Sequence, residues 1–244
     1  ALNILKGFDF VERDTVETLH KQIEALKLSF IDTMEYITDP RFMKVTAEQL
    51  LSERYANDRR ALINDMALDP KVGDPTYSGT VYFATADKDG NMVSMIQSNF
   101  RGFGSGIVVP GTGISLHDRG ENFCFDENHP NAIAGGKKPY HTIIPGFLTK
   151  DNEAVGPFGI MGGWMQPQAH MQVLMNTIDF HMNPQAALDA TRWQWIGGKT
   201  VEVEQDTPNH IIKKLQRMGH DIKVQPDPYH MGRGQIIWRD KNGV

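Results

Sequence analysis

Cysteine is almost missing from this chain, since Cys124 is the one cysteine among 244 residues. No intrachain disulfide can form, so the fold has to be held by a packed core. The 40% content of hydrophobic residues is enough for such a core. Cys124 lies between Phe123 and Phe125, and no motif marks a histidine partner for it. We therefore expect a buried structural thiol and not a catalytic one.

Long apolar runs and an excess of positive charge are also lacking. No run reaches the ~18 residues of a membrane-spanning helix, and the net charge of −5 comes from interspersed charges of both signs. The sequence therefore predicts a soluble protein with neither a membrane nor nucleic acid as partner. The chain opens on an apolar run without an initiator Met or a targeting pattern. It reads as part of a longer product, and the compartment stays open, with the cytoplasm favoured.

Metal and phosphate motifs are lacking as well. The nine histidines include no H-E-x-x-H and no paired ligand spacing, so we expect no metal and no other cofactor. The glycine-rich stretch Gly102–Gly113 has no G-K-S/T ending, which favours a tightly turning loop over a phosphate site. Trp193 and Trp195 are expected to pack in the core rather than to stack on bases.

The first part of the chain is predicted to be helical. Apolar residues recur every three or four positions over residues 16–37, and the Asp39-Pro40 pair ends that pattern. Thr46 and Gln49 form a capping-box pattern for a second helix, and a third is expected over Asn57–Met66. The segment Asp69–Gly79 holds two Asp-Pro pairs and reads as an exposed linker.

The second part is predicted to be rich in strands. A strand over Thr80–Asp87 and its partner up to Phe100 are joined by a turn that ends at Gly90. Further on, strands are expected at 143–149, 153–161, 200–203, 221–224 and 234–238, and helices at 167–180, 183–193 and 208–218. Because strands and helices do not alternate strictly, the order favours an α+β fold with antiparallel sheets layered by helices.

Thr80 opens the first of these strands, directly after Gly79 and the turn-rich linker. If the peptide bond before Thr80 were cut, its hydroxyl would lie beside a free α-amine. That amine titrates near ~8 and can act as the base for its own nucleophile. Thr80 is therefore a candidate amino-terminal nucleophile, with an ordinary strand threonine as the alternative.

Several collinear stretches then carry a family resemblance. These are ALNILKGFDF at the start, TVYFATADKDGNMVSMIQSNFRGFGSG from Thr80, and VVPGTGISL, GKKPYHTIIP and MGGW downstream. Together they resemble the γ-glutamyltranspeptidase family over nearly the whole chain. The resemblance implies the four-layer αββα sandwich of the N-terminal nucleophile hydrolases and a precursor that cuts itself. It also implies that the first part of the large subunit and about the last strand of the small one lie outside this sequence.

On this resemblance, residues 1–79 are the C-terminal part of the large subunit, with the linker at 69–79, and residues 80–244 are the small catalytic subunit. The implied partners are the remainder of the large subunit and a small-molecule amide substrate, and a homo-oligomer stays open. Thr80 matches the nucleophile, and Ser98 matches a second hydroxyl residue that orients it. Gly162 and Gly163 match the pair whose N–H groups form the oxyanion hole, a role that two bare amides at a strand-to-helix turn can fill.

The substrate-binding positions depart from the family pattern. Arg119 and Asn122 stand where the family holds the substrate's α-amine with an amide and an acidic residue. His141 and Thr142 replace paired serines that bind the α-carboxylate. A cation at an ammonium site is unfavourable, which points to a different acyl group.

We therefore interpret the chain as an N-terminal threonine amidohydrolase or acyltransferase, self-processed before Thr80, that cleaves a γ-glutamyl or related acyl amide. One alternative is an acylase for a dicarboxylic, glutaryl-type side chain, with Arg119 binding the anion. Another alternative is a non-catalytic homologue. For Arg119 itself, the alternative to anion binding is a side chain that points to solvent.

Overall fold

The structure, a computed structural model, describes residues 1–70 and 79–239. These residues divide into two compact units, each built from several segments. The first unit takes residues 1–70, 119–141 and 193–226, and the second takes residues 79–118, 142–192 and 227–239. The first unit thus combines segments from both sides of the Gly79–Thr80 bond. The expected division into two subunits concerns a covalent cut and stays a prediction.

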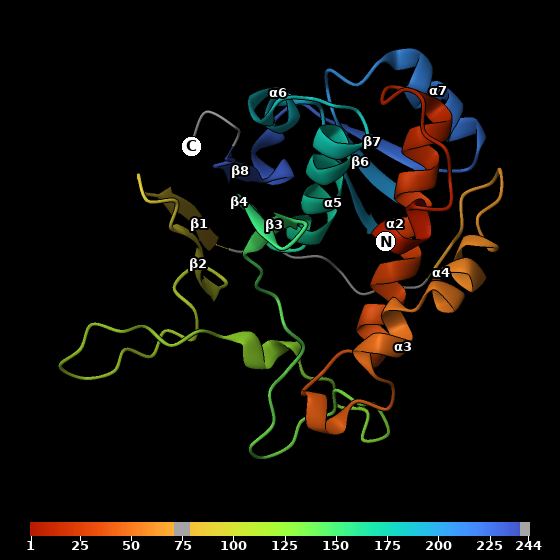
Figure 1. Ribbon diagram of the computed structural model, residues 1–244. Helices are drawn as coiled ribbons and strands as arrows, with labels where there is room; N and C mark the ends of the chain where they lie inside the picture. Colours follow the sequence, from red (N-terminus) through yellow and green to blue (C-terminus); the bar gives the residue numbers. More distant parts are fainter. Residues whose placement is uncertain (71–78, 240–244) are drawn as a thin grey trace. The chain divides into compact units, whose positions relative to one another are not determined.

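Helix α2, Val16–Tyr36, is the longest element of the first unit and confirms the first predicted helix (Figure 1). It begins where the Thr15 side chain accepts from the Thr18 N–H. Helix α1 covers Leu2–Leu5. A 3₁₀ turn, η1, covers Pro40–Phe42.

The capping box of Thr46 and Gln49 is confirmed, and it opens the short helix α3, Ala47–Leu51. The third predicted helix was misplaced, since α4 covers Glu53–Arg60 and not residues 57–66. The reason is local: the Ser52 side chain accepts from the Tyr55 N–H and caps the helix earlier than expected.

The sheet of the first unit has the order β5-β6-β7, with β5 at Trp193–Gly197, β6 at Thr200–Glu204 and β7 at Asp221–Gln225. Strands β6 and β7 are parallel, connected by α7, Asn209–Arg217, so the expectation of antiparallel sheets alone was wrong here. Strand β5 was also missed, because its first three residues are all buried and give no alternation. Trp195 packs against Phe30 of α2, with ring centroids 5.8 Å apart, so the packing role expected of this tryptophan is confirmed.

The second unit contains the β1–β2 hairpin, Gly79–Ala86 and Met92–Phe100, and an antiparallel sheet of order β3-β4-β8. Its strands cover Gly146–Lys150, Glu153–Met161 and Arg233–Ile236. Helices α5, Met165–Ile178, and α6, Pro184–Asp189, and the 3₁₀ turn η3, Pro228–Met231, complete this unit. Its core is formed by Ile160, Met165, Ala169, Val173 and Met231.

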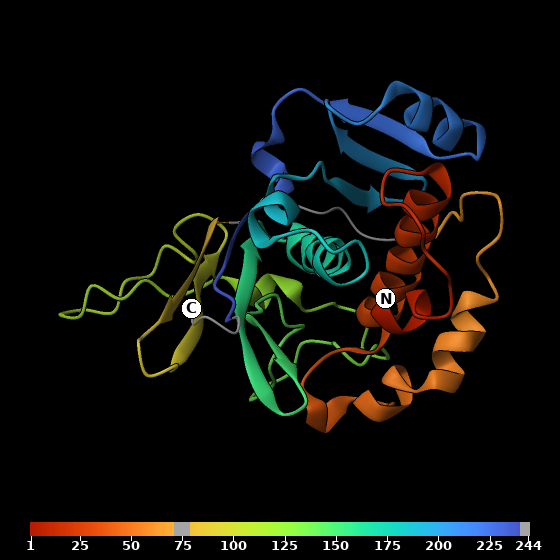
Figure 2. The ribbon, with the colours of Figure 1, turned by 45° about the horizontal axis from the view of Figure 1, so that its top comes forward.

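Beyond β2, residues 101–118 form an extended arm, visible at the left of both ribbon views (Figure 2). Gly104 has φ +72°, and a Cβ there would lie 2.3 Å from the Leu116 carbonyl oxygen, which explains the glycine. This agrees with the expected tight loop. A further 3₁₀ turn, η2, covers Arg119–Asn122. Cys124 is half-buried, which is less than the burial expected of this thiol.

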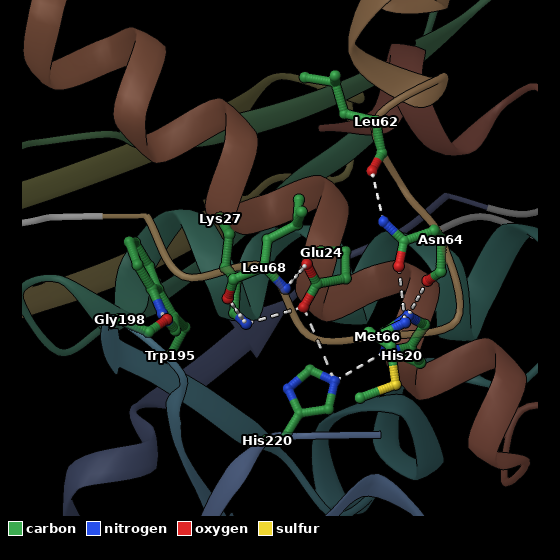
Figure 3. Close-up of polar contacts among 10 residues, drawn as sticks. All are labelled: His20, Glu24, Lys27, Leu62, Asn64, Met66, Leu68, Trp195, Gly198 and His220. Atoms are coloured by element: carbon green, nitrogen blue, oxygen red, sulfur yellow. Dashed lines mark hydrogen bonds and ion pairs between the residues drawn. The ribbon is translucent and has the colours of Figure 1, made fainter. Parts of the chain in front are cut away.

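A buried polar cluster joins α2 to the rest of the first unit (Figure 3). His20 Nε2 lies 2.7 Å from the carbonyl oxygen of Asn64, and because a carbonyl only accepts, this nitrogen carries the proton. Nδ1 of His20 lies within hydrogen-bond distance of Nε2 of His220, at 2.7 Å. Beside them Lys27 donates to Glu24 at 2.8 Å, with neither side chain exposed. These contacts hold the side chains of the cluster in one arrangement.

We expect the protein to lose stability in mild acid because of this cluster. Burial, helped by the charge of Lys27, lowers the pKa of His220 from 6.5 to about 3. Between these values the unfolded chain binds more protons, so stability falls as pH drops from 6.5 towards 3, by at most ~1.4 kcal/mol per pH unit. Urea unfolding at pH 7, 5.5 and 4.5 should show a shallower pH dependence for His220→Gln than for the parent. Equal pH dependence in both proteins would contradict this assignment.

Candidate active site

Thr80 and Ser98 lie opposite each other in the β1–β2 hairpin. The Thr80 hydroxyl donates to the Ser98 Oγ at 3.0 Å, and the Phe100 N–H donates to the same oxygen at 2.9 Å. Ser98 is therefore held by the backbone of its own strand and in turn fixes the Thr80 side chain. The structure brings together the two hydroxyl residues that the sequence singled out.

The face of β1 that carries Thr80 is the inward one. Thr80 and Tyr82 are two residues apart and so point to the same side, while Val81 and Phe83 are exposed on the other. Tyr82 is 1% exposed, and a Cβ on Gly159 of β4 would lie 2.4 Å from its ring. Because Gly159 has no side chain, β4 can pack closely against Tyr82. Tyr82 therefore packs β1 against β4 next to Thr80, a role that sequence analysis did not assign to it.

Strand β4 leads directly to Gly162 and Gly163, which precede α5. Both have positive φ, +141° and +59°, as expected where a side chain would be strained. The Gly162 carbonyl accepts from the Met165 N–H at 3.0 Å. Since N–H and C=O of a trans peptide point in opposite directions, the Gly163 N–H points away from α5. This orientation suits a donor to an oxyanion in front of the helix.

The four residues expected to bind substrate are divided between the units. Thr142 belongs to the second unit with Thr80, whereas Arg119, Asn122 and His141 belong to the first. Arg119 is only 7% exposed, which rules out the reading in which it points to solvent. Asn122 is half-buried and donates to the Tyr140 carbonyl at 3.4 Å, and His141 is exposed.

The sequence predicted no metal site, but one group of side chains places its ligand atoms close enough together to hold a metal ion. Among residues 1–70 and 79–239, His20, Glu24 and His220 place their ligand atoms within 4.8 Å of one another. The contacts described above already engage them: the two imidazoles bond each other, and Glu24 pairs with Lys27. A buried ammonium beside Glu24 opposes a bound cation. We assign this group a structural role.

Comparison with known proteins agrees with this geometry. The family model described as Gamma-glutamyltranspeptidase matches residues 1–244. The chain is 37% identical over 254 residues to the Glutathione hydrolase-like YwrD proenzyme of Bacillus subtilis (strain 168), covering 100% of this chain and 48% of that protein. It is 32% identical to the Oxamate amidohydrolase proenzyme of Klebsiella pneumoniae, covering 100% of this chain and 47% of that one. The chain therefore belongs to the gamma-glutamyltranspeptidase family.

A solved structure supports the same assignment. The crystal structure of cephalosporin acylase from Bacillus halodurans is 62% identical, with a TM-score of 0.92 over 99% of this chain and 44% of that one. The α+β fold class expected from the sequence, of the N-terminal nucleophile hydrolase type, is thereby confirmed. This chain spans about half the length of these relatives. None of the helices in the described part of the chain is long and apolar enough to cross a membrane.

The hydrogen bond from Thr80 leads to a direct prediction for Ser98. Replacing Ser98 by Ala removes the acceptor that fixes the Thr80 hydroxyl, so kcat should fall about tenfold or more with little change in KM. Initial rates of the processed protein on an acyl-p-nitroanilide measure both constants. Ser115→Ala, on the arm formed by residues 101–118, is the control and should match the parent. If Ser98→Ala also matches the parent, Ser98 is an ordinary strand residue.

Proposed function

We propose that this chain carries the processing site and the catalytic threonine of an N-terminal threonine amidohydrolase. The observation that carries the proposal is the Thr80–Ser98 hydrogen bond at the first position after the Gly79–Thr80 bond. It supplies an oriented hydroxyl where a cut would create an α-amine on the same residue. The proenzyme names of the two relatives support a precursor that is cleaved. The rest of the large subunit completes the enzyme in this proposal.

Maturation is the first reaction. The Thr80 hydroxyl oxygen attacks the Gly79 carbonyl carbon, the C–N bond breaks, and the hydroxyl proton ends on the nitrogen that becomes the α-amine. Water then hydrolyses the resulting ester, which leaves a carboxylate on Gly79 and restores the hydroxyl of Thr80. The product is a threonine with its base attached.

Amide hydrolysis follows the same pattern. The α-amine takes the Thr80 hydroxyl proton as the oxygen attacks the substrate carbonyl, and it returns the proton to the leaving amine. Gly162 and Gly163 N–H groups stabilise the oxyanion, and Ser98 holds the nucleophile in place. The acyl ester is then released to water, or to a second amine in a transfer reaction.

For the acyl group, we propose a dicarboxylic chain in preference to a γ-glutamyl group. Arg119 is buried at the position where the resemblance places recognition of an ammonium. A buried guanidinium favours a carboxylate and disfavours an ammonium. The 62% identity to a cephalosporin acylase supports an acyl group other than γ-glutamyl. A γ-glutamyl substrate is the second candidate, favoured by the glutathione hydrolase relative.

The proposal is tested by trapping the acyl-enzyme. The full-length processed protein is mixed with glutaryl-p-nitroanilide, quenched in acid during turnover and digested. We expect the glutaryl mass on the peptide that begins with Thr80. Release of p-nitroaniline with the glutaryl group on another residue would exclude Thr80 as the nucleophile.

A further inference from the structure

One buried side chain ties together the segment that carries Asn122 and His141. Asn131 is 5% exposed. Its Oδ1 accepts from the Tyr140 N–H at 3.0 Å, and its Nδ2 donates to the Asn122 carbonyl at 2.5 Å. Because an N–H only donates and a carbonyl only accepts, these partners fix the orientation of the amide. Asn131 thus sets the spacing between the backbones of Asn122 and Tyr140, the residue before His141.

The same amide is anchored to the segment that precedes the proposed cut. The Thr38 hydroxyl donates to Asn131 Oδ1 at 2.9 Å, so this oxygen accepts two bonds. Next to it, Asp39 accepts from the Lys138 N–H at 3.1 Å and from Arg41 at 2.7 Å. These hydrogen bonds hold the pKa of Asp39 well below its ordinary value, and the bond from the Arg41 side chain has the largest effect. All of these residues belong to the first unit.

We propose that Asn131 is a positioning residue for acyl-group recognition, which sets Asn122 and His141 in register through their backbones and is itself held by Thr38. The inference rests on the proposed function, since it concerns the same substrate-binding positions. This role needs an acceptor for two donors and, on the same planar group, a donor for one carbonyl, which a side-chain amide supplies. In the processed enzyme, Thr38 of the large subunit would thereby help to position Asn122 and His141, the substrate-binding residues of the small subunit.

Asn131→Asp is the sharpest variant, because it keeps the shape and both acceptor bonds. It replaces the Nδ2 donor by an oxygen facing the Asn122 carbonyl, so only that contact turns repulsive. Asn128→Asp adds the same charge three residues earlier, at an exposed position, and is the matched control. Thr38→Val removes the hydroxyl donor without changing the side-chain size, and it decides the question if Asn131→Asp does not fold.

The readout is the ratio of kcat/KM for glutaryl-p-nitroanilide to that for pentanoyl-p-nitroanilide, which lacks the terminal carboxylate. We expect Asn131→Asp to lower this ratio at least tenfold, mainly through KM, and Thr38→Val to lower it less. Asn128→Asp should leave it unchanged, and self-processing should proceed in all variants. A merely structural role would slow both substrates equally, and an unchanged ratio in a folded Asn131→Asp or Thr38→Val variant would overturn the proposal.

Failure of the proposed function has a separate signature, namely a parent protein that hydrolyses neither substrate. Calorimetric titration with glutarate then decides about Asn131 without catalysis. Weaker binding to Asn131→Asp than to Asn128→Asp supports the positioning role. Equal binding to the two variants, or no binding to the parent, overturns it.

Discussion

Thr80→Ala is expected to give a full-length protein that stays one chain and hydrolyses no amide. Alanine has no oxygen to attack the Gly79 carbonyl, so neither the ester nor the new α-amine can form. Thr80→Ser keeps the oxygen and should retain part of both reactions. Electrophoresis of the purified protein over time, together with p-nitroaniline release, measures the cut and the activity.

Thr85→Ala is the matched control for this pair of variants. It is a threonine of the same strand whose side chain points to the exposed face. This variant should be processed and active like the parent. Fragments with the 79/80 boundary from Thr80→Ala would show that another residue performs the cut, and the assignment of the nucleophile would be wrong.

The second large effect concerns the acyl group. Glutaryl-p-nitroanilide should be a better substrate than γ-glutamyl-p-nitroanilide by roughly ten- to a hundredfold. A lost hydrogen bond to a charged group costs ~1.5–3 kcal/mol, and each 1.4 kcal/mol is tenfold. The added ammonium of the γ-glutamyl group would face the buried Arg119 instead of an acid. The measurement is kcat/KM for both compounds on the processed protein.

Arg119→Met should remove most of this preference, because methionine fills a similar volume without the charge. Arg54→Met, at an exposed position of α4, removes the same charge far from the loop in sequence and should keep the preference. Equal or better turnover of the γ-glutamyl compound by the parent would mean that other residues bind the amine. The second candidate function would then take the place of the first.

Much of the geometry of the candidate site could be predicted because it is local. The turn at Gly90 sets the register of the hairpin, and this register pairs Thr80 with Ser98. Similarly, Gly162 and Gly163 stand between a predicted strand and a predicted helix, where positive φ requires glycine. Such features are encoded within about twenty residues of sequence, which is the range that periodicity and turn chemistry cover.

The features that sequence reasoning missed depend on contacts between distant segments. Asn131 meets Thr38 across 93 positions, and no local pattern in an irregular loop marks that pair. The parallel pairing of β6 and β7 depends likewise on a crossover and not on the strands themselves. The burial of Arg119 was undecided for the same reason, since a charged residue in a loop is exposed unless the rest of the fold covers it.

Intact-mass spectrometry of the freshly purified full-length protein tests the central claim most directly. We predict two polypeptides whose masses sum to the precursor plus one water, with Gly79 at the end of one and Thr80 at the start of the other. A single uncut chain that persists under conditions in which the protein is folded would contradict it. That result would leave the fold in place and remove the catalytic threonine from the account.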